Sequence, residues 1–379
     1  MDAPRSLPVR RRTVLAAAGA AVAAASAGAA RASAAARQPV AAPAALTARQ
    51  TAGQRVIYSY PGLTVPSTLL TRISAGQAAG VIFFGENISS ESQITAVVKQ
   101  LVQANAASPV KAPLLLMTDQ EGGEVRRLPG APALSEKQVG EAAQPQTAAT
   151  QAGTGAGQNL AGVGMNVNLA PVLDVYYTAG NFVDKYQRSY SNNASTVSSL
   201  GKAFITAQQG AGVAATAKHF PGLGAATASQ DTDAGPVTLT QSLSKLRTVD
   251  ELPYQAAIAA GVRLVMVSWA VYPALDASAP AGLSATVVQQ ELRGRLGYTG
   301  VTVTDALEAG AISSSYSTAQ RAVLAAGAGM DLLLCSARDV SQGDAAAQAL
   351  ADAYTGGGLP AAGFDAAVQR VTALRTSLS

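Results

Sequence analysis

Eight short, continuous apolar runs constrain the fold of this chain more than any other feature. They alternate with longer alanine-rich stretches in which apolar residues recur at helical spacing. Such continuous runs are typical of parallel strands that are buried on both faces. The runs are Arg55–Ser59, Val81–Gly85, Leu114–Asp119, Met165–Pro171, Ala215–Pro221, Leu264–Ala270, Val301–Leu307 and Leu332–Ser336. Eight strands that alternate with helices predict an α/β fold, a single-domain (β/α)8 TIM barrel.

Polar residues gather at the ends of several of these runs. Asp119-Gln120-Glu121 ends the third run, and Lys218-His219 lies in the fifth. Ser268-Trp269 ends the sixth run, and Asp305 lies near the end of the seventh. Because barrel enzymes build their active sites at the C-terminal ends of the strands, these residues are candidates for one site. A doubly wound open sheet is the alternative fold, but no glycine-rich phosphate-binding turn follows the first run.

The N-terminal segment has the pattern of an export signal. Arg10, Arg11 and Arg12 precede an unbroken run of small apolar residues from Val14 to Ala25. The order resembles a twin-arginine signal, and Ala30-Arg31-Ala32 offers a cleavage site. We therefore predict a signal peptide at residues 1–32 and a secreted or extracytoplasmic protein. A membrane anchor is the alternative, but the run is shorter than the roughly 20 apolar residues that a bilayer requires.

The net charge and the counts of cysteine and histidine limit the classes of partner and cofactor that the chain can bind. The formal net charge is +4, and residues 1–32 contain five arginines and one aspartate, so the rest of the chain is close to neutral. This balance argues against nucleic acid or an anionic membrane as a partner. The single cysteine, Cys335, excludes an internal disulfide and lies in an apolar run, where a buried small residue is expected. With one histidine and no H-E-x-x-H motif, we expect no metal and no cofactor.

The remaining organisation is simple. Residues 33–55 are rich in alanine and glutamine and show little periodicity, which predicts a flexible tether. Residues 56–379 would form the barrel, because no second shift in composition marks another domain. We expect a monomer with no stable membrane insertion after the signal is removed.

Four segments resemble the family 3 glycoside hydrolases of the β-N-acetylhexosaminidase type, in the family's order and across nearly the whole mature chain. Residues 119–128 read D-Q-E-G-G-E-V-R-R-L, and residues 168–175 read N-L-A-P-V-L-D-V, followed by R-S-Y at 188–190. Residues 218–222 read K-H-F-P-G, and residues 303–307 read V-T-D-A-L. The match is specific because these pieces are long.

The resemblance places Asp305 in the position of the catalytic nucleophile. A retaining glycosidase needs one carboxylate that attacks the sugar and a nearby acid that protonates the leaving group. The alternative for Asp305 is a helix N-cap, because Ala306-Leu307-Glu308 could begin a helix. The resemblance also implies a carbohydrate-binding pocket for the nonreducing-end sugar. Its hydroxyl-binding residues would be Asp119, Arg127, Arg188, Lys218 and His219.

The chain departs from the family pattern where the general acid is expected. Related hexosaminidases carry a histidine paired with an aspartate on the loop after K-H-F-P-G, but His219 is the only histidine of this chain. Asp231 or Asp233 would then be the acid, and Asp233 stands closest to the lost histidine. Trp269 is a second departure, because family members often have histidine there. It could stack on a sugar or be an ordinary core tryptophan.

Two hypotheses of function follow. The first is a retaining hydrolase that removes terminal β-linked N-acetylglucosamine, with cell-wall fragments as a substrate source and β-glucosidase activity as a variant. The second is a sugar-binding protein of the same fold with weak or no turnover. Retention of Asp305 favours the first hypothesis, and loss of the loop histidine favours the second.

Overall fold

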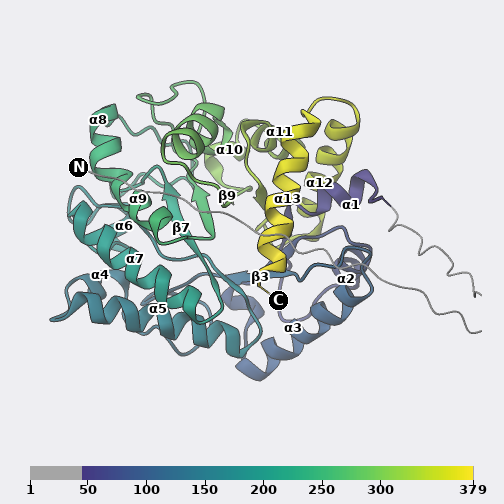
Figure 1. Cartoon of the computed structure of the whole chain (residues 1–379), viewed down its shortest axis with the longest axis horizontal. Helices are drawn as coiled ribbons and strands as arrows, with labels where there is room; N and C mark the ends of the chain where they lie inside the picture. The colour runs from purple at the N-terminus through teal and green to yellow at the C-terminus, as the bar shows by residue number, and fades with distance from the viewer. Residues whose placement is uncertain (1–44, 379) are drawn as a thin grey trace, which may run out of the picture. The chain divides into compact units, whose positions relative to one another are not determined.

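The computed structural model describes residues 45–378, which contain a closed barrel of eight parallel strands. Each of the eight apolar runs overlaps one of these strands, so the predicted (β/α)8 barrel is confirmed. Figure 1 shows helices arranged around these strands. The strands are β1 (Val56–Tyr58), β2 (Gly80–Ile82), β3 (Leu115–Thr118), β6 (Val167–Asn168), β7 (Ala214–Phe220), β8 (Leu264–Val267), β9 (Val301–Ala306) and β10 (Leu332–Leu334). The ring closes where Val56 of β1 pairs with Leu333 of β10.

Helices connect successive strands on the outside of the barrel. They are α1 (Ala48–Gly53), α2 (Ser67–Ser74), α3 (Glu91–Ala106), α4 (Glu136–Gly140), α5 (Pro145–Gly162), α6 (Phe182–Lys185), α7 (Ala194–Gly210), α8 (Leu243–Lys245), α9 (Leu252–Ala259), α10 (Gly310–Ser313), α11 (Thr318–Ala328), α12 (Val340–Thr355) and α13 (Ala361–Thr376). Short 3₁₀ turns occupy Gly85–Asn87 and Ala281–Leu283. Leu246–Asp250 and Thr286–Arg295 are π-helical, and the second of these connects β8 to β9.

Two layers of apolar side chains hold the barrel together. The interior layer contains alternate residues of the strands, among them Ile57, Leu115 and Val303, and is joined by Val371 and Leu374 of α13. The outer layer lies between the strands and the surrounding helices. Alternation of strand side chains between these layers explains why the runs are apolar on both faces along most of their length. The strand ends are therefore the places where polar side chains can project into one shared space.

The prediction of a flexible tether is wrong for its described part. The folded unit begins at Ala45, and α1 lies within the segment predicted to be a tether. Thr47 and Gln50 form a capping box at its start, and Arg49 contacts Asp344 of α12 at 3.3 Å. Local capping and a tertiary contact order this segment without apolar periodicity. The predicted signal peptide and residues 33–44 lie outside the described residues.

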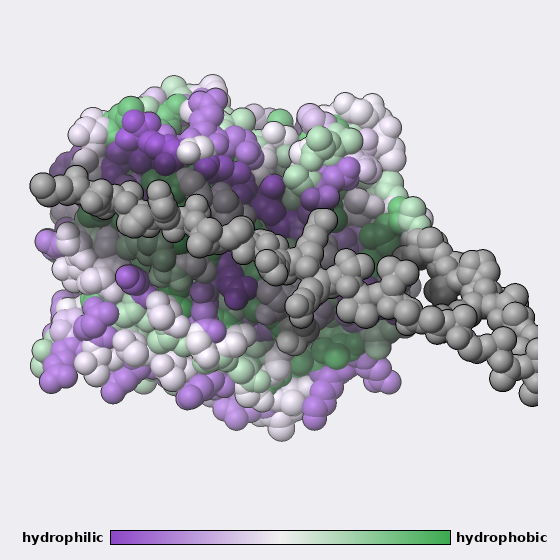
Figure 2. All heavy atoms as spheres, in the orientation of Figure 1, coloured by the Kyte–Doolittle hydropathy of each residue, from purple (hydrophilic) through white to green (hydrophobic). Residues whose placement is uncertain are grey.

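On the face in Figure 2, hydrophilic and more hydrophobic side chains are mixed over the surface. None of the helices within residues 45–378 combines the length and apolar character that a membrane crossing needs.

Candidate active site

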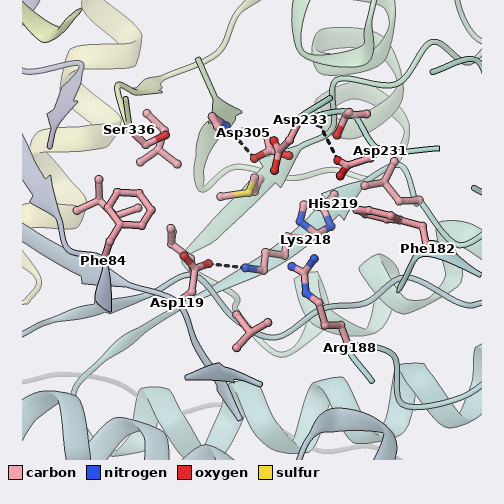
Figure 3. Close-up of a pocket in the computed structure, with 18 of the residues that line it drawn as sticks. Phe84, Asp119, Phe182, Arg188, Lys218, His219, Asp231, Asp233, Asp305 and Ser336 are labelled. Carbon is pink, nitrogen blue, oxygen red and sulfur yellow. Dashed lines mark hydrogen bonds and ion pairs between the residues drawn. The ribbon is translucent and has the colours of Figure 1, made fainter. Parts of the chain in front are cut away.

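A cavity of about 210 Å³ lies at the C-terminal ends of the barrel strands. All eight residues predicted from the sequence to act in the site line this cavity (Figure 3). They are Asp119, Arg127, Arg188, Lys218, His219, Asp231, Asp233 and Asp305. The structure therefore brings together residues that are separated by up to 186 positions in the chain, from Asp119 to Asp305.

Different elements place these side chains. Lys218 and His219 belong to β7, and Asp305 belongs to β9. Asp119 stands between β3 and β4 (Gln120–Gly122), and Arg127 directly follows β5 (Val125–Arg126). The small antiparallel pair of β4 and β5 folds over the strand end. The remaining residues lie in loops, so the rigid barrel supplies part of the site and the loops complete it.

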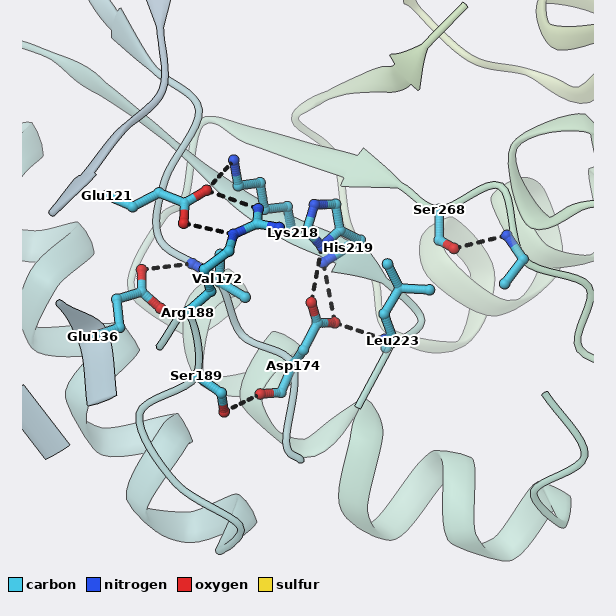
Figure 4. A network of polar contacts seen from close by, with 12 residues as sticks. Glu121, Glu136, Val172, Asp174, Arg188, Ser189, Lys218, His219, Leu223 and Ser268 are labelled. Atoms are coloured by element: carbon cyan, nitrogen blue, oxygen red, sulfur yellow. Dashed lines mark hydrogen bonds and ion pairs between the residues drawn. The ribbon is translucent and has the colours of Figure 1, made fainter. Parts of the chain in front are cut away.

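Glu121 organises the cationic side of the cavity, although sequence reasoning did not assign it a role. Its Oε1 lies 2.7 Å from Nζ of Lys218, which is also 2.7 Å from Oδ1 of Asp119. Arg188 donates two hydrogen bonds to Glu121, at 2.9 and 2.8 Å (Figure 4). Burial alone would raise the pKa of Glu121, but the charges of Arg188 and Lys218 outweigh it and lower the pKa to about 2. The two cations are thus held by a buried anion.

A second buried carboxyl group, Glu136, lies behind this network. Its Oε1 accepts a hydrogen bond from the backbone N–H of Val172 at 2.9 Å. Burial, together with the negative charge of Glu121, raises the pKa of Glu136 well above its ordinary value. This shift favours the neutral form of Glu136, which adds no further anion beside Lys218 and Arg188.

Removal of the charge of Glu121 is expected to destabilise the fold strongly. Glu121→Gln should lower the free energy of unfolding by about 3–5 kcal/mol, because Arg188 loses its charged partner and Lys218 keeps only Asp119. The folded-state pKa of about 2 lies below the ordinary 4.5, so this contribution is complete above pH 4.5 and is lost as the pH falls toward 2. Urea unfolding at neutral and acid pH measures both effects. Glu124→Gln, on an exposed residue of the same turn, is the control, and equal stability of the two variants would contradict the assignment.

Asp174 orients the only histidine of the chain. Its Oδ2 lies 2.8 Å from Nδ1 of His219, and its Oδ1 accepts from the backbone N–H groups of His219 at 3.3 Å and Leu223 at 2.7 Å. Figure 4 shows the carboxylate between the imidazole and the start of the following loop. With Nδ1 engaged, Nε2 of His219 remains to contact a ligand in the cavity. Asp174 lies in the family-like segment A-P-V-L-D-V, which was the available signal for it.

Asp305 and Asp233 form the anionic side of the cavity. Asp305 lies inside β9, and its Oδ1 accepts from the backbone N–H of Ala306 at 2.7 Å. The next helix, α10, begins at Gly310 with Ala309 as its N-cap residue, so the N-cap alternative for Asp305 is wrong. Figure 3 shows the carboxylates of Asp305 and Asp233 next to each other.

The two candidate acids differ in their surroundings. Asp231 accepts a hydrogen bond from the backbone N–H of Asp233 at 2.9 Å and so stabilises the turn of the loop. Asp233 faces the open cavity, yet partial burial, followed by the negative charges of Asp305 and Asp231, raises its pKa to about 6. A raised pKa is the property that a carboxylic acid needs to donate a proton near neutral pH. These surroundings favour Asp233 over Asp231 for that role.

Apolar side chains complete the cavity wall. Phe84 and Phe182 stand at opposite sides of the cavity in Figure 3, and sequence reasoning missed both. Aromatic and aliphatic walls suit the C–H faces of a sugar ring. Trp269 is not among the lining residues: it is fully buried and donates a hydrogen bond from Nε1 to the carbonyl oxygen of Ala306 at 2.8 Å. The core interpretation of Trp269 is therefore confirmed, and the stacking interpretation is wrong.

Within residues 45–378, no three or more histidine, cysteine, aspartate or glutamate side chains are grouped so that they could hold a metal ion. Cys335 is buried, and burial raises the pKa of its thiol far above the ordinary value. Cys335 therefore behaves as a small core residue and not as a thiolate.

The sequence is similar to several known glycoside hydrolases. The sequence profile "Glycosyl hydrolase family 3 N terminal domain" matches residues 61–374. An "Uncharacterized secreted glycosyl hydrolase" of Arthroderma benhamiae is 47% identical over 343 residues, which cover 90% of this chain and 97% of the relative. "Beta-hexosaminidase A" of Pseudoalteromonas piscicida is 31% identical, and the match covers 89% of this chain and 62% of that protein.

Solved structures of glycoside hydrolases are also similar to this chain. The chain superposes with a TM-score of 0.83 on a family 3 β-N-acetylglucosaminidase from Paenibacillus sp., with 36% identity, over 88% of this chain and 63% of that one. A β-N-acetylhexosaminidase from Beutenbergia cavernae gives a TM-score of 0.78 and 34% identity, over 87% of this chain and 99% of that one. The chain thus spans less than two thirds of the Pseudoalteromonas and Paenibacillus proteins but nearly all of the Arthroderma and Beutenbergia proteins.

Proposed function

Because the chain belongs to glycosyl hydrolase family 3, we propose that this glycoside hydrolase removes terminal β-linked N-acetylglucosamine through a covalent intermediate on Asp305. The observation that carries the proposal is the pair of neighbouring carboxyl groups in the cavity. Asp305 lies beside Asp233, whose pKa is raised to about 6. A nucleophilic carboxylate next to a protonated acid is the arrangement that a retaining glycosidase requires.

In the proposed two-step reaction, each carboxyl group has one task in each step. In the first step, Asp305 attacks the anomeric carbon while Asp233 transfers its proton to the departing glycosidic oxygen. The aglycone leaves as an alcohol, and the sugar remains as an ester of Asp305. In the second step, a water molecule attacks the anomeric carbon while Asp233 takes a proton from this water. The ester bond breaks, Asp305 leaves as a carboxylate, and the sugar is released with retained configuration. The reaction leaves both side chains in their starting protonation states.

The charged residues opposite this pair would bind the sugar hydroxyls. Asp119 offers an acceptor, Lys218 offers N–H donors, and the free ring nitrogen of His219 offers a donor or an acceptor according to its tautomer. Arg188 and Lys218 are fixed by Glu121, so they can present hydrogen-bonding groups without losing further conformational freedom on binding. This preorganisation supports a pocket for one terminal sugar.

The preference for N-acetylglucosamine and the export of the protein rest on the relatives. The solved relatives are described as β-N-acetylglucosaminidase and β-N-acetylhexosaminidase, and the Arthroderma relative as secreted. We propose that this protein acts outside the cytoplasm, following a twin-arginine-type signal, on glycans that include cell-wall-derived fragments. The alternatives remain a β-glucosidase and a sugar-binding protein with little turnover.

The substrate preference has a direct test. Initial rates with 4-nitrophenyl N-acetyl-β-glucosaminide and 4-nitrophenyl β-glucoside compare two substrates that differ only at the 2-position. We expect kcat/KM to be higher for the first by about 100-fold, because buried polar groups reject a substrate that leaves them unpaired. A preference for the glucoside would identify a β-glucosidase. Binding of both sugars without turnover would favour the sugar-binding protein.

Arg127 provides the clearest binding prediction. Its side chain lines the cavity, and its buried Nε has no hydrogen-bond partner among the described residues. Arg127→Ala should therefore weaken the affinity for N-acetylglucosamine by about 1.5–3 kcal/mol, the contribution of a charged hydrogen bond. Calorimetric titration measures the affinity. Arg126→Ala is the control, because Arg126 donates to the carbonyl oxygen of Gly130 and does not line the cavity. Unchanged affinity in Arg127→Ala would remove this residue from the sugar site.

A further inference from the structure

Two backbone hydrogen bonds join the loop that carries Asp233 to the segment that follows Asp305. The N–H of Gly310 donates to the carbonyl oxygen of Asp233 at 2.8 Å, and the N–H of Ala311 donates to the carbonyl oxygen of Thr232 at 2.9 Å. The donors lie at the start of α10, directly after β9. The proposed acid and the proposed nucleophile are thus linked through the backbone, although their side chains belong to segments 72 positions apart.

Gly310 fits this contact because it has no side chain. A Cβ atom at this position would lie 2.6 Å from the carbonyl carbon and oxygen of Ala234 and 2.8 Å from the carbonyl oxygen of Asp233. Cβ atoms essentially never approach other heavy atoms this closely, and the atoms met here are backbone atoms that cannot rotate away. The backbone of Gly310 is not in the left-handed region, so glycine is needed there for space and not for its conformation.

The other end of the same loop is held independently. The carbonyl oxygen of Gly224 accepts from the backbone N–H of Tyr177 at 2.9 Å and from the side chain of Asn181 at 2.6 Å. Loss of the contacts at Gly310 and Ala311 would therefore shift the part of the loop near Asp233 and leave its beginning in place.

We propose that Gly310 and Ala311 are positioning residues that hold the Asp233 carboxyl group against Asp305 and the glycosidic oxygen. The inference rests on the proposed role of Asp233 as general acid. A general acid acts only within hydrogen-bond reach of the oxygen that it protonates. Displacement of a reacting group by about 1 Å can cost roughly 100-fold in rate. A backbone contact next to Asp233 therefore controls the protonation step more than it controls binding of the sugar.

The test compares two substrates that differ in their need for an acid. The first is the β-1,4-linked disaccharide of N-acetylglucosamine, and the second is a 2,4-dinitrophenyl N-acetyl-β-glucosaminide, whose leaving group departs without protonation. Gly310→Ala should lower kcat/KM for the disaccharide by about 30-fold or more and change kcat/KM for the aryl glycoside by less than about threefold. The ratio kcat/KM reports the first step, so a slower second step does not obscure the comparison.

The pH profile provides a readout that a purely structural role would not move. Burial, followed by the negative charges of Asp305, Asp231 and Glu308, raises the pKa of Asp233, and His219 lowers it. When Asp233 moves away from these anions and into solvent, its pKa falls. The alkaline limb of the disaccharide profile should therefore shift to lower pH in Gly310→Ala.

Two further variants make the result specific. Gly235→Ala is the matched control, because Gly235 lies in the same loop and a Cβ atom there meets no atom within 4 Å. It should leave both substrates and the pH profile unchanged. Ala311→Pro removes the second donor by a different route, since proline has no N–H and is tolerated in the first turn of a helix. It should reproduce the leaving-group-dependent loss.

The outcomes separate this inference from the proposed function. Equal losses on both substrates, or no loss in either Gly310→Ala or Ala311→Pro, would overturn the positioning role. If Asp233→Ala shows the leaving-group dependence and the two positioning variants do not, only the positioning role is lost. If Asp233→Ala shows no leaving-group dependence, Asp233 is not the acid. The acid role of Asp233 and the positioning role of Gly310 and Ala311 then fail together.

Discussion

Replacement of Asp305 by asparagine is expected to lower kcat/KM toward an N-acetylglucosaminide by about 10⁴-fold, a loss of roughly 5.4 kcal/mol in transition-state stabilisation. An amide cannot form the ester that splits the reaction into two accessible steps. Steady-state rates with the 4-nitrophenyl glycoside of wild type and variant measure the loss.

The stability of Asp305→Asn serves as the control for this experiment. The only side-chain hydrogen bond of Asp305 within the described residues is with the N–H of Ala306, and an asparagine oxygen can accept it equally well. The melting temperature should therefore remain unchanged, so lost turnover cannot be attributed to unfolding. If Asp305→Asn retained more than about a tenth of the wild-type rate, the result would contradict the role of Asp305 as nucleophile.

Replacement of Asp233 by alanine is expected to separate the two kinds of substrate. General acid catalysis contributes about 10²–10⁴-fold, and this contribution should disappear for the disaccharide. The first step with an aryl glycoside should be spared, because nitrophenolate leaves without a proton. Azide should partly restore the second step, because it attacks the ester without a general base.

Asp231→Ala is the comparison variant. It should retain more of the disaccharide activity than Asp233→Ala, because Asp231 supports the loop through the N–H of Asp233 and does not itself supply the proton. If neither variant affects the disaccharide, the acid is another residue. If the wild type cleaves only activated aryl glycosides, the loop has lost its acid without replacement, and the sugar-binding hypothesis gains support.

The pH dependence follows from the surroundings of Asp233. The first step needs the protonated acid, and burial and neighbouring anions place the pKa of Asp233 at about 6. The ratio kcat/KM for the disaccharide should therefore fall as the pH rises through about 6. The Asp233→Ala variant should lack this limb, and an identical limb in wild type and variant would assign the titration to a different group.

The barrel could be predicted from the sequence because its strands are buried on both faces. Leu264–Ala270 and the other runs are largely apolar for this reason, and each overlaps a strand of the barrel. The residues of the site could be predicted for a related reason: the C-terminal ends of parallel strands meet at one edge. The helix at Ala48–Gly53 could not be predicted from periodicity, because a capping box and a contact with α12 stabilise it.

The buried carboxyl groups show where sequence reasoning ends. Glu121 and Asp174 lie inside the family-like segments, but the sequence does not show that Glu121 turns inward to hold Lys218 and Arg188. Nor does it show that Asp174 supports His219. The close contact at Gly310 depends on the loop at Asp233, far away in the chain, and only the three-dimensional structure reveals it.

Trapping of the covalent intermediate tests the central claim most directly. Wild type and Asp305→Asn are incubated with a slow fluorinated N-acetylglucosaminyl donor, and intact masses are measured, followed by peptide mapping. The account predicts that the wild type gains the mass of one glycosyl group on the peptide that contains Asp305, and that the variant gains none. Equal labelling of both proteins, or labelling of a different residue in the wild type, would contradict the assignment of Asp305 as the nucleophile.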